Sequence, residues 1–344
     1  MKPFDGQSNR SRRIGRLILM SGITFSLLVI LSFAVYAIST VAHSSFPRGA
    51  TGQGSPLSST NGTPTEPPIT CTTPQHAAGN SNNTITSDSL KRTFLLHLPP
   101  SYGRQPQPVV INYHGYTETT QVFAQYSNMA VESDKAGFIL VYPQGEDNPT
   151  TWNAGIGAYG PTGDADDVQF TRDLISNLEK NYCVDAHRIY VTGYSIGGGM
   201  AYRVACNLST EIAAFATVEG AFYTAPGGCH PSHPVPVLEI HGQADHFAPY
   251  TGNPPLLMAA VQPYLSNWLN WDQCSNTTRT FFQQSDVTGI EWPHCADGTV
   301  VAHYIISDGG HTWAGATPRP SLGFTTHTID ANVVIWDFFK QFSI

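Results

Sequence analysis

Apolar residues in this chain occur in two patterns: short unbroken runs, and longer stretches in which they recur every three or four positions. Unbroken runs are typical of strands buried on both faces of a sheet, and the longer period is typical of amphipathic helices. This alternation of strands and helices predicts an α/β fold with a mostly parallel central sheet and helices on both faces. The expected strands are 92–98, 108–113, 138–142, 187–192, 215–220, 235–240 and 299–306, and the expected helical segments are 123–135, 166–178, 200–206, 256–270 (helical or lid-like) and 330–340.

The first 70 residues follow neither pattern. Residues 1–16 hold five basic residues against a single acid, and residues 17–42 contain no charged residue. An apolar segment of this length can span a bilayer as a helix, and the basic residues before it place the N-terminus in the cytoplasm. We expect either an uncleaved signal anchor or a long signal peptide that is cleaved after Ala37 or Ala42.

Residues 43–70 are rich in Ser, Thr, Gly and Pro, a composition that is typical of a flexible tether. The folded domain is therefore expected over 71–344, outside the cell and connected to the membrane only through the N-terminal segment. The chain is 41% hydrophobic and 12% charged, so this domain can bury a large core. The formal net charge is −8, of which residues 1–16 contribute +4. The remainder is acidic and lacks the basic face that nucleic-acid binding requires.

All six cysteines follow the apolar N-terminal segment. An even number of cysteines in an exported domain indicates disulfides, although the sequence alone does not fix their pairing. Proximity along the expected fold suggests the pairs Cys71–Cys183, Cys206–Cys229 and Cys274–Cys295. A metal site is not expected, because the chain contains neither a Cys-x-x-Cys nor a His-Glu-x-x-His sequence.

The segment 193–197, with the sequence Gly-Tyr-Ser-Ile-Gly, lies between the expected strand 187–192 and the expected helix 200–206. A Gly-x-Ser-x-Gly sequence in this context is the pattern of a nucleophile elbow, in which the serine occupies a tight, strained turn. The residues two before and two after the serine must be small so that the strand and the helix can approach each other. Ser195 is therefore the candidate nucleophile.

Two further strand ends carry the groups that an activated serine needs. Asp245 follows the strand 235–240, and His311 follows the strand 299–306. The order Ser, Asp, His is that of the α/β-hydrolase fold, in which functional groups gather at the carboxyl ends of parallel strands. An imidazole can accept the serine proton near neutral pH, and a carboxylate on its other nitrogen fixes the tautomer and stabilises the imidazolium. Ser195, Asp245 and His311 are the predicted triad.

Four other groups near these strand ends are assigned lesser roles. His246 is the rival base, but it adjoins the proposed acid and precedes the last expected strand. Asp308 is the rival acid, but it lies too near His311 in sequence to reach across to it. His114 and His241 each precede a glycine and are expected to be structural, packing or orienting their loops.

The oxyanion of a tetrahedral intermediate needs backbone N–H donors. The N–H of Ile196, directly after the nucleophile, and that of Tyr116, after the second expected strand, are the candidates. Trp152, Tyr194 and Trp313 are candidate substrate-binding residues that would line an acyl or aryl pocket. Ordinary packing in the core or at its rim is the alternative for these three aromatic residues.

Several ordered motifs occur along the chain, and they are Leu-Leu-His-Leu-Pro-Pro-Ser-Tyr at 95–102, Tyr-Pro at 142–143, Trp-Asn-Ala-Gly at 152–155, Asp-Asp-Val at 166–168, the elbow with two further glycines, His-Gly-Gln-Ala-Asp at 241–245 and Gly-Gly-His-Thr-Trp at 309–313. Together they resemble the polyhydroxybutyrate depolymerase-like esterases, a group related to the secreted feruloyl and acetylxylan esterases. The resemblance covers roughly residues 85–343 and implies a serine esterase that uses the same triad and no cofactor. Ile196, Tyr116 and Ala314 depart from the residues usual in that family, which leaves the substrate preference open.

These observations predict an exported serine carboxylic-ester hydrolase that works through an acyl-enzyme. The expected substrates are feruloyl or acetyl esters of plant cell-wall polysaccharide, and the alternative is polyhydroxybutyrate or another hydroxyalkanoate ester. A serine peptidase and a non-catalytic binding module on the same fold are further alternatives. The binding module is disfavoured because all three triad residues are present. The sequence does not fix the oligomeric state.

Overall fold

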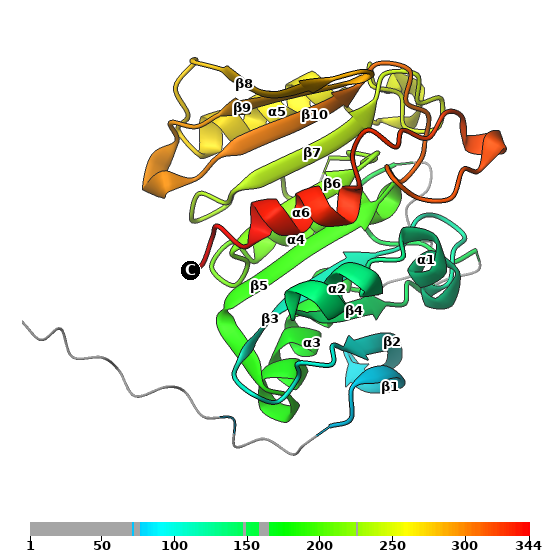
Figure 1. Cartoon of the computed structure of the whole chain (residues 1–344), viewed down its shortest axis with the longest axis vertical. Coiled ribbons are helices and arrows are strands. Elements are labelled where there is room, and N and C mark those ends of the chain that lie inside the picture. Colours follow the sequence, from blue (N-terminus) through cyan, green and yellow to red (C-terminus); the bar gives the residue numbers. More distant parts are fainter. Residues whose placement is uncertain (1–70, 72–75, 147–148, 158–164, 225) are drawn as a thin grey trace, which may run out of the picture. The chain divides into compact units, whose positions relative to one another are not determined.

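The computed structural model describes residues 71, 76–146, 149–157, 165–224 and 226–344 of the chain (Figure 1). All of the described residues belong to one compact unit. The predicted basic region 1–16, apolar segment 17–42 and linker 43–70 lie outside the described residues. Within the described part of the chain, no helix is both long enough and apolar enough to span a membrane.

The described residues form a ten-stranded sheet in the order β1-β2-β4-β3-β5-β6-β7-β10-β9-β8. Its strands are β1 (Gly79–Ser87), β2 (Leu90–Leu98), β3 (Gln107–Tyr113), β4 (Ile139–Pro143), β5 (Val184–Tyr194), β6 (Ala214–Val218), β7 (Val237–Gly242), β8 (Arg279–Gln284), β9 (Val287–Trp292) and β10 (Val301–Ile306). The run from β4 to β10 is parallel, and the two strands flanking it on either side pair in antiparallel fashion. The prediction of a mostly parallel sheet is confirmed.

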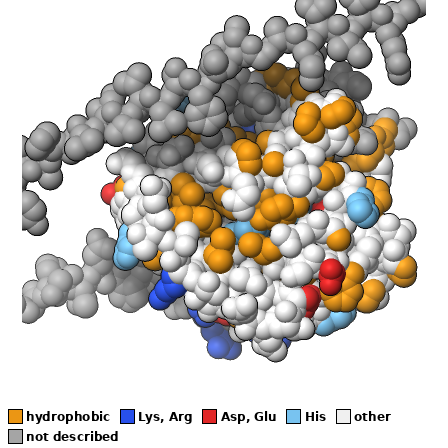
Figure 2. Space-filling view, turned by 90° about the horizontal axis from the view of Figure 1, so that it is seen from above, with side chains coloured by type: hydrophobic (Ala, Val, Ile, Leu, Met, Phe, Trp, Pro, Cys, Tyr) orange, Lys and Arg blue, Asp and Glu red, His pale blue; other side chains and the backbone are white. Residues whose placement is uncertain are grey.

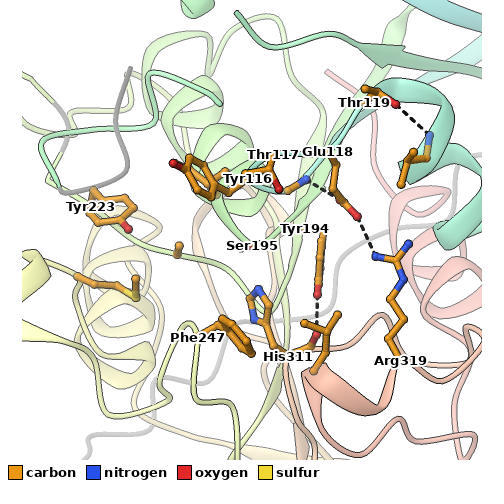
Figure 3. Close-up of a pocket in the computed structure, with 16 residues that line it drawn as sticks. Tyr116, Thr117, Glu118, Thr119, Tyr194, Ser195, Tyr223, Phe247, His311 and Arg319 are labelled. Atoms are coloured by element: carbon orange, nitrogen blue, oxygen red, sulfur yellow. Dashed lines mark hydrogen bonds and ion pairs between the residues drawn. The ribbon is translucent and has the colours of Figure 1, made fainter. Parts of the chain in front are cut away.

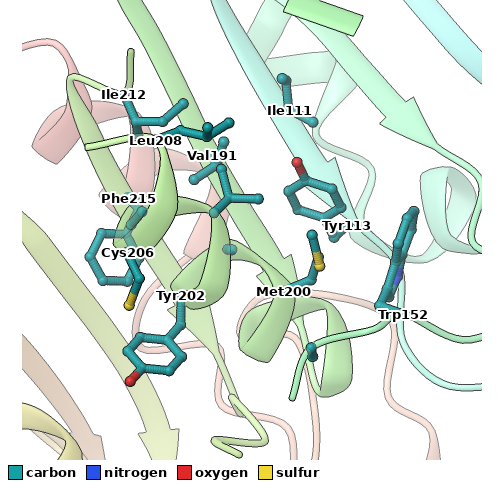
Figure 4. Close-up of a cluster of buried hydrophobic side chains, with 14 of the residues drawn as sticks. Ile111, Tyr113, Trp152, Val191, Met200, Tyr202, Cys206, Leu208, Ile212 and Phe215 are labelled. Atoms are coloured by element: carbon teal, nitrogen blue, oxygen red, sulfur yellow. The ribbon is translucent and has the colours of Figure 1, made fainter. Parts of the chain in front are cut away.

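Helices cover both faces of this sheet (Figure 1). They are α1 (Thr120–Ser127), α2 (Ala130–Ala136), α3 (Asp167–Asn181), α4 (Ile196–Asn207), α5 (Val261–Trp271) and α6 (Ala331–Phe339). Helices α3, α4 and α5 pack on one apolar cluster, and α1, α2 and α6 pack on a second. Val109 and Ile111 of β3 belong to the first cluster and Val110 to the second, because successive strand residues point to opposite faces. Figure 4 shows the first cluster, with Met200 of α4 beside Tyr113 and Val191 on the sheet.

The expected single helix over 123–135 is two helices, α1 and α2. Asn128, at the end of α1, adopts a left-handed conformation with φ 52°, and its N–H donates to the carbonyl of Ala124. Asparagine tolerates this conformation better than most residues, so the apolar spacing continues while the backbone turns. The prediction of one continuous helix was wrong for this reason.

Strands β1, β8 and β9 were not predicted. Strands β1 and β8 lie at the two edges of the sheet, and most of their residues are exposed or half-buried. Edge strands of this kind lack the unbroken apolar run that marks the central strands. Strand β9 pairs with β8 in a hairpin and continues the sheet next to β10.

The three disulfides pair as predicted. They are Cys71–Cys183, Cys206–Cys229 and Cys274–Cys295, with Cα–Cα distances of 5.4, 5.2 and 3.8 Å. The first fixes the start of the described domain to the turn between α3 and β5. The second and third fix the ends of α4 and α5 to segments that follow β6 and β9. No cysteine in the described part of the chain is free.

Candidate active site

The carboxyl ends of the parallel strands surround a cavity of about 630 Å³ (Figure 3). Ser195 directly follows β5, and His311 lies in the loop after β10. Both side chains line the cavity. Asp245, in the loop after β7, is buried and contacts His311 rather than the cavity. The structure therefore places Ser195 and His311 at one cavity and Asp245 in contact with His311.

The turn that carries Ser195 has the geometry expected of a nucleophile elbow. Ser195 adopts φ 59° and ψ −123°, a conformation that non-glycine residues rarely hold. A Cβ on Gly193 would overlap the carbonyl of Gly197, and a Cβ on Gly197 would overlap the carbonyl of Tyr113. The two glycines are thus required by the close approach of β5, α4 and β3. This approach leaves the Ser195 side chain at the cavity wall.

His311 and Asp245 form a short hydrogen bond. The Nδ1 atom of His311 lies 2.6 Å from Oδ2 of Asp245, so Nδ1 carries the proton and donates it to the carboxylate. The other oxygen, Oδ1, accepts the backbone N–H groups of Phe247 at 2.7 Å and Ala248 at 2.9 Å. With Nδ1 committed in this way, Nε2 is the ring nitrogen that can accept a proton from Ser195.

Asp245 is ionised at neutral pH. Burial alone acts to raise the pKa of its carboxyl group. The hydrogen bond and charge of His311 outweigh that effect and, with help from His241 and the Ala248 amide, hold the pKa of Asp245 below its ordinary value. The carboxylate can therefore stabilise an imidazolium on His311 without taking its proton.

Tyr194 both lines the cavity and supports the candidate base. Its hydroxyl donates to the backbone carbonyl of His311 at 2.5 Å, and the two rings lie 4.9 Å apart. Burial raises the pKa of Tyr194 well above its ordinary value, so the phenol keeps its proton and remains a donor. Tyr194 thus lines the cavity while its polar group is directed to the His311 backbone, and its role in substrate binding stays a prediction.

The two candidate oxyanion donors belong to different elements of the fold. Ile196 is the first residue of α4, where the helix N-terminus favours negative charge, and Tyr116 lies in the loop after β3. Both residues line the cavity. Their backbone N–H groups stay the predicted donors for an oxyanion.

Hydrogen bonds of the His114 ring fix the loop that carries Tyr116. Its Nδ1 donates to the carbonyl of Gly115 at 2.8 Å, and its Nε2 accepts the N–H of Gly145 at 2.9 Å. Burial lowers the pKa of His114 to about 4, so this ring is neutral, as its two bonds require. The interpretation of His114 as a structural residue is confirmed.

Trp152 and Trp313 do not line the cavity, and their predicted substrate-binding role is corrected. Both side chains are fully buried. Trp152 donates through Nε1 to the carbonyl of His114 and thereby holds the loop that carries Tyr116. Trp313 donates through Nε1 to Asn332 and packs its ring against Phe123. The aromatic character of these positions was visible in the sequence, but the direction of the side chains was not.

The rival triad residues are placed away from the chemistry. His246 and Asp308 are exposed, and neither lines the cavity. His241 is buried, donates through Nε2 to the carbonyl of Ala248 at 2.8 Å, and contacts Glu239 through Nδ1 at 2.7 Å. It is therefore structural, as predicted, and it orients the loop that carries Asp245.

Sequence reasoning missed most of the cavity wall. Apolar side chains of Val122, Tyr223, Met258 and Leu322 line it, and they come from loops and a helix whose joint position no local pattern reveals. Phe247 also lines it, with 55% of its surface exposed and its ring 5.4 Å from that of His311. Figure 2 shows hydrophobic side chains gathered across the centre of one face of the molecule.

One ion pair stands at the same cavity. Arg319 donates to Glu118 at 2.9 Å, and its guanidinium lies 3.5 Å from the centre of the Tyr126 ring (Figure 3). The second oxygen of Glu118 accepts the N–H of Gly115 at 3.1 Å. Because the two charges neutralise each other, the cavity presents an apolar wall with little net charge. The partners are far apart in sequence, so only the fold reveals this pair.

Three buried groups near the triad have the composition of a metal site. Donor atoms of Glu219, His241 and Asp245 lie within 4.8 Å of one another. The oxygens of Asp245 already accept bonds from His311 and two backbone amides, and His241 Nε2 already donates to a carbonyl. These atoms are engaged in a hydrogen-bonded network, and that is the arrangement the geometry supports.

Comparisons with known proteins find relatives among the esterases. Residues 92–232 match the family described as "Esterase PHB depolymerase". Feruloyl esterase B of Piromyces equi is 29% identical over 269 residues, covering 74% of this chain and 46% of that protein. The bifunctional acetylxylan esterase/xylanase XynS20E of Neocallimastix patriciarum is 24% identical over 250 residues, covering 71% of this chain and 32% of that protein. The chain thus spans less than half the length of either relative.

Solved structures show the same fold. An acetyl xylan esterase from Aspergillus awamori matches with a TM-score of 0.52 at 16% identity, over 67% of this chain and 94% of that one. A thermostable esterase matches with a TM-score of 0.51 at 13% identity, over 77% of this chain and 63% of that one. The predicted α/β-hydrolase fold is thus confirmed.

Proposed function

We propose that this chain, of which residues 92–232 match the family described as "Esterase PHB depolymerase", is an exported serine carboxylic-ester hydrolase. The observation that carries the proposal is the hydrogen bond between His311 and Asp245 beside a serine on a strained turn. That arrangement activates a hydroxyl that is otherwise a poor nucleophile. The three disulfides support an oxidising compartment outside the cytoplasm.

The proposed reaction proceeds through an acyl-enzyme. The Ser195 oxygen attacks the ester carbonyl while His311 Nε2 takes the serine proton, and Asp245 stabilises the resulting imidazolium. The backbone N–H groups of Ile196 and Tyr116 hold the oxyanion. Collapse of the intermediate breaks the ester C–O bond, and His311 returns the proton to the leaving alcohol. Water then attacks the acyl group through the same steps and releases the acid.

The proposed substrates are feruloyl or acetyl esters of plant cell-wall polysaccharide. A cavity of about 630 Å³ lies within the range of sites that enclose a drug-sized ligand, so a methoxyphenyl acyl group can enter it. An acetyl group would leave most of that space unfilled, which favours the aromatic acid. The names of the two relatives that act on feruloyl and acetylxylan esters support this class. Hydroxyalkanoate esters remain the alternative, supported by the family name and the apolar wall.

Replacement of Ser195 tests the catalytic assignment. Ser195→Ala removes the nucleophile, and kcat on p-nitrophenyl acetate should fall by roughly 10⁴–10⁶-fold. Labelling by a fluorophosphonate probe should disappear in the same variant. Ser266→Ala is the matched control, because Ser266 is an exposed serine of α5, and it should keep both properties. Hydrolysis by Ser195→Ala at the wild-type rate would show the triad assignment to be wrong.

A substrate panel tests the specificity. Initial rates on methyl ferulate, acetylated xylan and hydroxybutyrate oligomers, measured with one preparation, should be highest on methyl ferulate. The highest kcat/KM on the oligomers would replace the polysaccharide assignment with the polyester one. In either case Ser195→Ala should abolish the rate, so the panel separates the choice of substrate from the existence of the triad.

A further inference from the structure

Glu219 is a buried acid that the proposed mechanism does not use. It directly follows β6, which lies between the strand that leads to Ser195 and the strand that leads to Asp245. Its side chain is fully buried, although it carries an ionisable group. Glutamate is almost never fully buried unless its carboxyl group is partnered, so its contacts need an explanation.

The backbone at Glu219 is also unusual. Its φ angle is 50°, in the left-handed region that favours glycine. Residues close to Glu219 in sequence fix the nucleophile turn. The carbonyl of Val218 accepts the N–H of Ser195, and the N–H of Ala221 donates to the carbonyl of Ser195. A strained backbone and a buried acid at one position are both costly, and such features concentrate where a site needs them.

Few donors face the Glu219 carboxyl group. Both of its oxygens approach one backbone N–H, that of Gly242, at 3.0 and 2.9 Å. His241 Nε2 lies 3.5 Å from Glu219, but its proton is directed to the carbonyl of Ala248 at the shorter distance of 2.8 Å. A carboxylate can accept several hydrogen bonds, so an ionised Glu219 would be poorly satisfied here. A protonated carboxyl group instead needs one acceptor of its own.

Asp245 can supply that acceptor. A carboxyl oxygen of Glu219 and one of Asp245 lie within 4.8 Å of each other in one buried cluster, so a proton on one carboxyl group can be donated to the other. Asp245 already accepts His311 and two backbone amides, so it is the better-stabilised anion. Two carboxyl groups that share a buried site do not both ionise, and the less well hydrogen-bonded member keeps its proton. Glu219 accepts fewer hydrogen bonds than Asp245, so the proton belongs to Glu219.

We propose that Glu219 is a positioning residue that stays protonated and donates its carboxyl O–H to Asp245, aiming the Asp245 carboxylate at His311. The proposal rests on the triad assigned under the proposed function. It adds a fourth member to the hydrogen-bonded chain, which then runs from Glu219 through Asp245 and His311 to Ser195. Glu219 touches neither the cavity nor the reacting atoms, so its effect passes through Asp245.

The electrostatic surroundings agree with this assignment. Burial, followed by the charge of Asp245, raises the pKa of Glu219 well above its ordinary value. Burial also raises the pKa of Glu239 to about 7. Its Oε1 lies 2.7 Å from Nδ1 of His241, so a single proton between these two atoms makes their hydrogen bond. The phenols of Tyr126 and Tyr194 also interact electrostatically with Glu219. Both stay neutral because burial raises their pKa.

The test compares two substitutions of one side chain. Glu219→Gln keeps a neutral group of the same shape that can donate to Asp245, whereas Glu219→Ala removes the donor. We expect Glu219→Ala to lower kcat by about 10–100-fold with less than a threefold change in KM, and Glu219→Gln to recover most of that loss. Equal losses in the two variants would overturn the proposal, because an ionised Glu219 predicts no recovery by the neutral amide.

A second measurement reports the proton directly and does not need activity. An acid that is protonated when folded and ionised when unfolded loses stability as pH rises above its ordinary value, and the amide does not. The melting temperature of Glu219→Gln minus that of the wild type should therefore increase steadily from pH 5 to pH 9. A difference that stays flat or falls over this range would mean that Glu219 is ionised in the folded protein.

The control for both measurements is Asp272→Asn. Asp272 is another fully buried acid with a raised pKa, but it lies at the end of α5 and does not line the cavity. This variant should change stability with pH while kcat stays at the wild-type value. If Ser195→Ala retains activity, the proposed function fails. If Ser195→Ala is inactive and Glu219→Gln is as impaired as Glu219→Ala, only the role of Glu219 fails.

Discussion

Ser195 and Glu219 both hold backbone conformations with positive φ angles, 59° and 50°. Each such residue costs about 1–3 kcal/mol and persists only where the surrounding structure enforces it. The backbone bonds that fix Ser195 come from Val218 and Ala221, which flank the second strained residue. The two turns therefore restrain each other, and a change that relaxes one is expected to move the other.

At the residue scale, Tyr194 gives a prediction about how the base is held. Tyr194→Phe removes the hydroxyl that donates to the carbonyl of His311 but keeps the ring at the cavity wall. Loss of a buried hydrogen bond costs about 1–2 kcal/mol, so kcat should fall about 10-fold while KM changes little. Steady-state kinetics on p-nitrophenyl acetate measure this effect.

Tyr190→Phe is the matched control for that experiment. The Tyr190 hydroxyl also donates to a backbone carbonyl, that of Phe342, at 2.7 Å, and Tyr190 does not line the cavity. Both variants should lower the melting temperature, but only Tyr194→Phe should lower kcat. A similar loss of kcat in both would indicate that the effect comes from general destabilisation.

The sequence predicted which residue types meet at the site better than it predicted where side chains point. Ser195, Asp245 and His311 could be found because each follows an apolar strand, and parallel strands end at one edge. For Trp152 and Trp313 the sequence leaves pocket lining and core packing as alternatives, and both side chains are fully buried. No local signal distinguishes an aromatic ring that faces a cavity from one that faces a core.

At the element scale, strands were predicted where both of their faces are buried. All five residues of β4 are buried, and its apolar run is unbroken, whereas β1 has the sequence Gly-Asn-Ser-Asn-Asn-Thr-Ile-Thr-Ser and is mostly exposed. The pairing of β1 with β2 comes from backbone hydrogen bonds, which every residue except proline can make. The amino-acid composition of β1 therefore does not indicate that this segment forms a strand.

Asp272, at the end of α5, gives a prediction about stability at this scale. Its Oδ1 accepts the N–H of Val235, its Oδ2 has no hydrogen-bond partner, and burial raises its pKa to about 7. A buried acid with a raised pKa stabilises the folded state least when pH lies above that value, because ionisation then favours the unfolded chain.

Asp272→Asn should therefore leave stability nearly unchanged at pH 4 and increase the free energy of unfolding at pH 8. The upper limit is about 4 kcal/mol, from 1.36 kcal/mol for each pKa unit of the shift. Urea unfolding at the two pH values, followed by tryptophan fluorescence, measures the difference. A loss of stability at pH 8 would mean that the carboxylate, rather than the carboxylic acid, fits this position.

At the scale of the whole domain, the three disulfides differ in the length of chain that they close. Cys71 and Cys183 are 112 residues apart, whereas Cys274 and Cys295 are 21 apart. Because a cross-link stabilises mainly by restricting the unfolded chain, the longer loop should contribute about 5 kcal/mol and the shorter about 3 kcal/mol.

The paired substitutions Cys71→Ser with Cys183→Ser, and Cys274→Ser with Cys295→Ser, test this order. The first pair should lower the free energy of unfolding by about 1–2 kcal/mol more than the second, as measured by denaturant titration. Neither pair lines the cavity, so kcat at 25 °C should stay near the wild-type value in both variants. The reverse order of stabilities would mean that local packing outweighs loop length.

The carboxylate of Glu118 joins parts of the site that come from distant regions of the chain. One oxygen accepts the N–H of Gly115, beside the proposed oxyanion donor, and the other accepts Arg319. Arg319 begins the segment in which the carbonyl of Leu322 accepts the N–H of His311. As the chain leaves the ribosome, the nucleophile and the acid are therefore made well before the base and the residues that anchor it. The proposed hydrolytic activity can therefore arise only after the last strand of the sheet, β10, has been made.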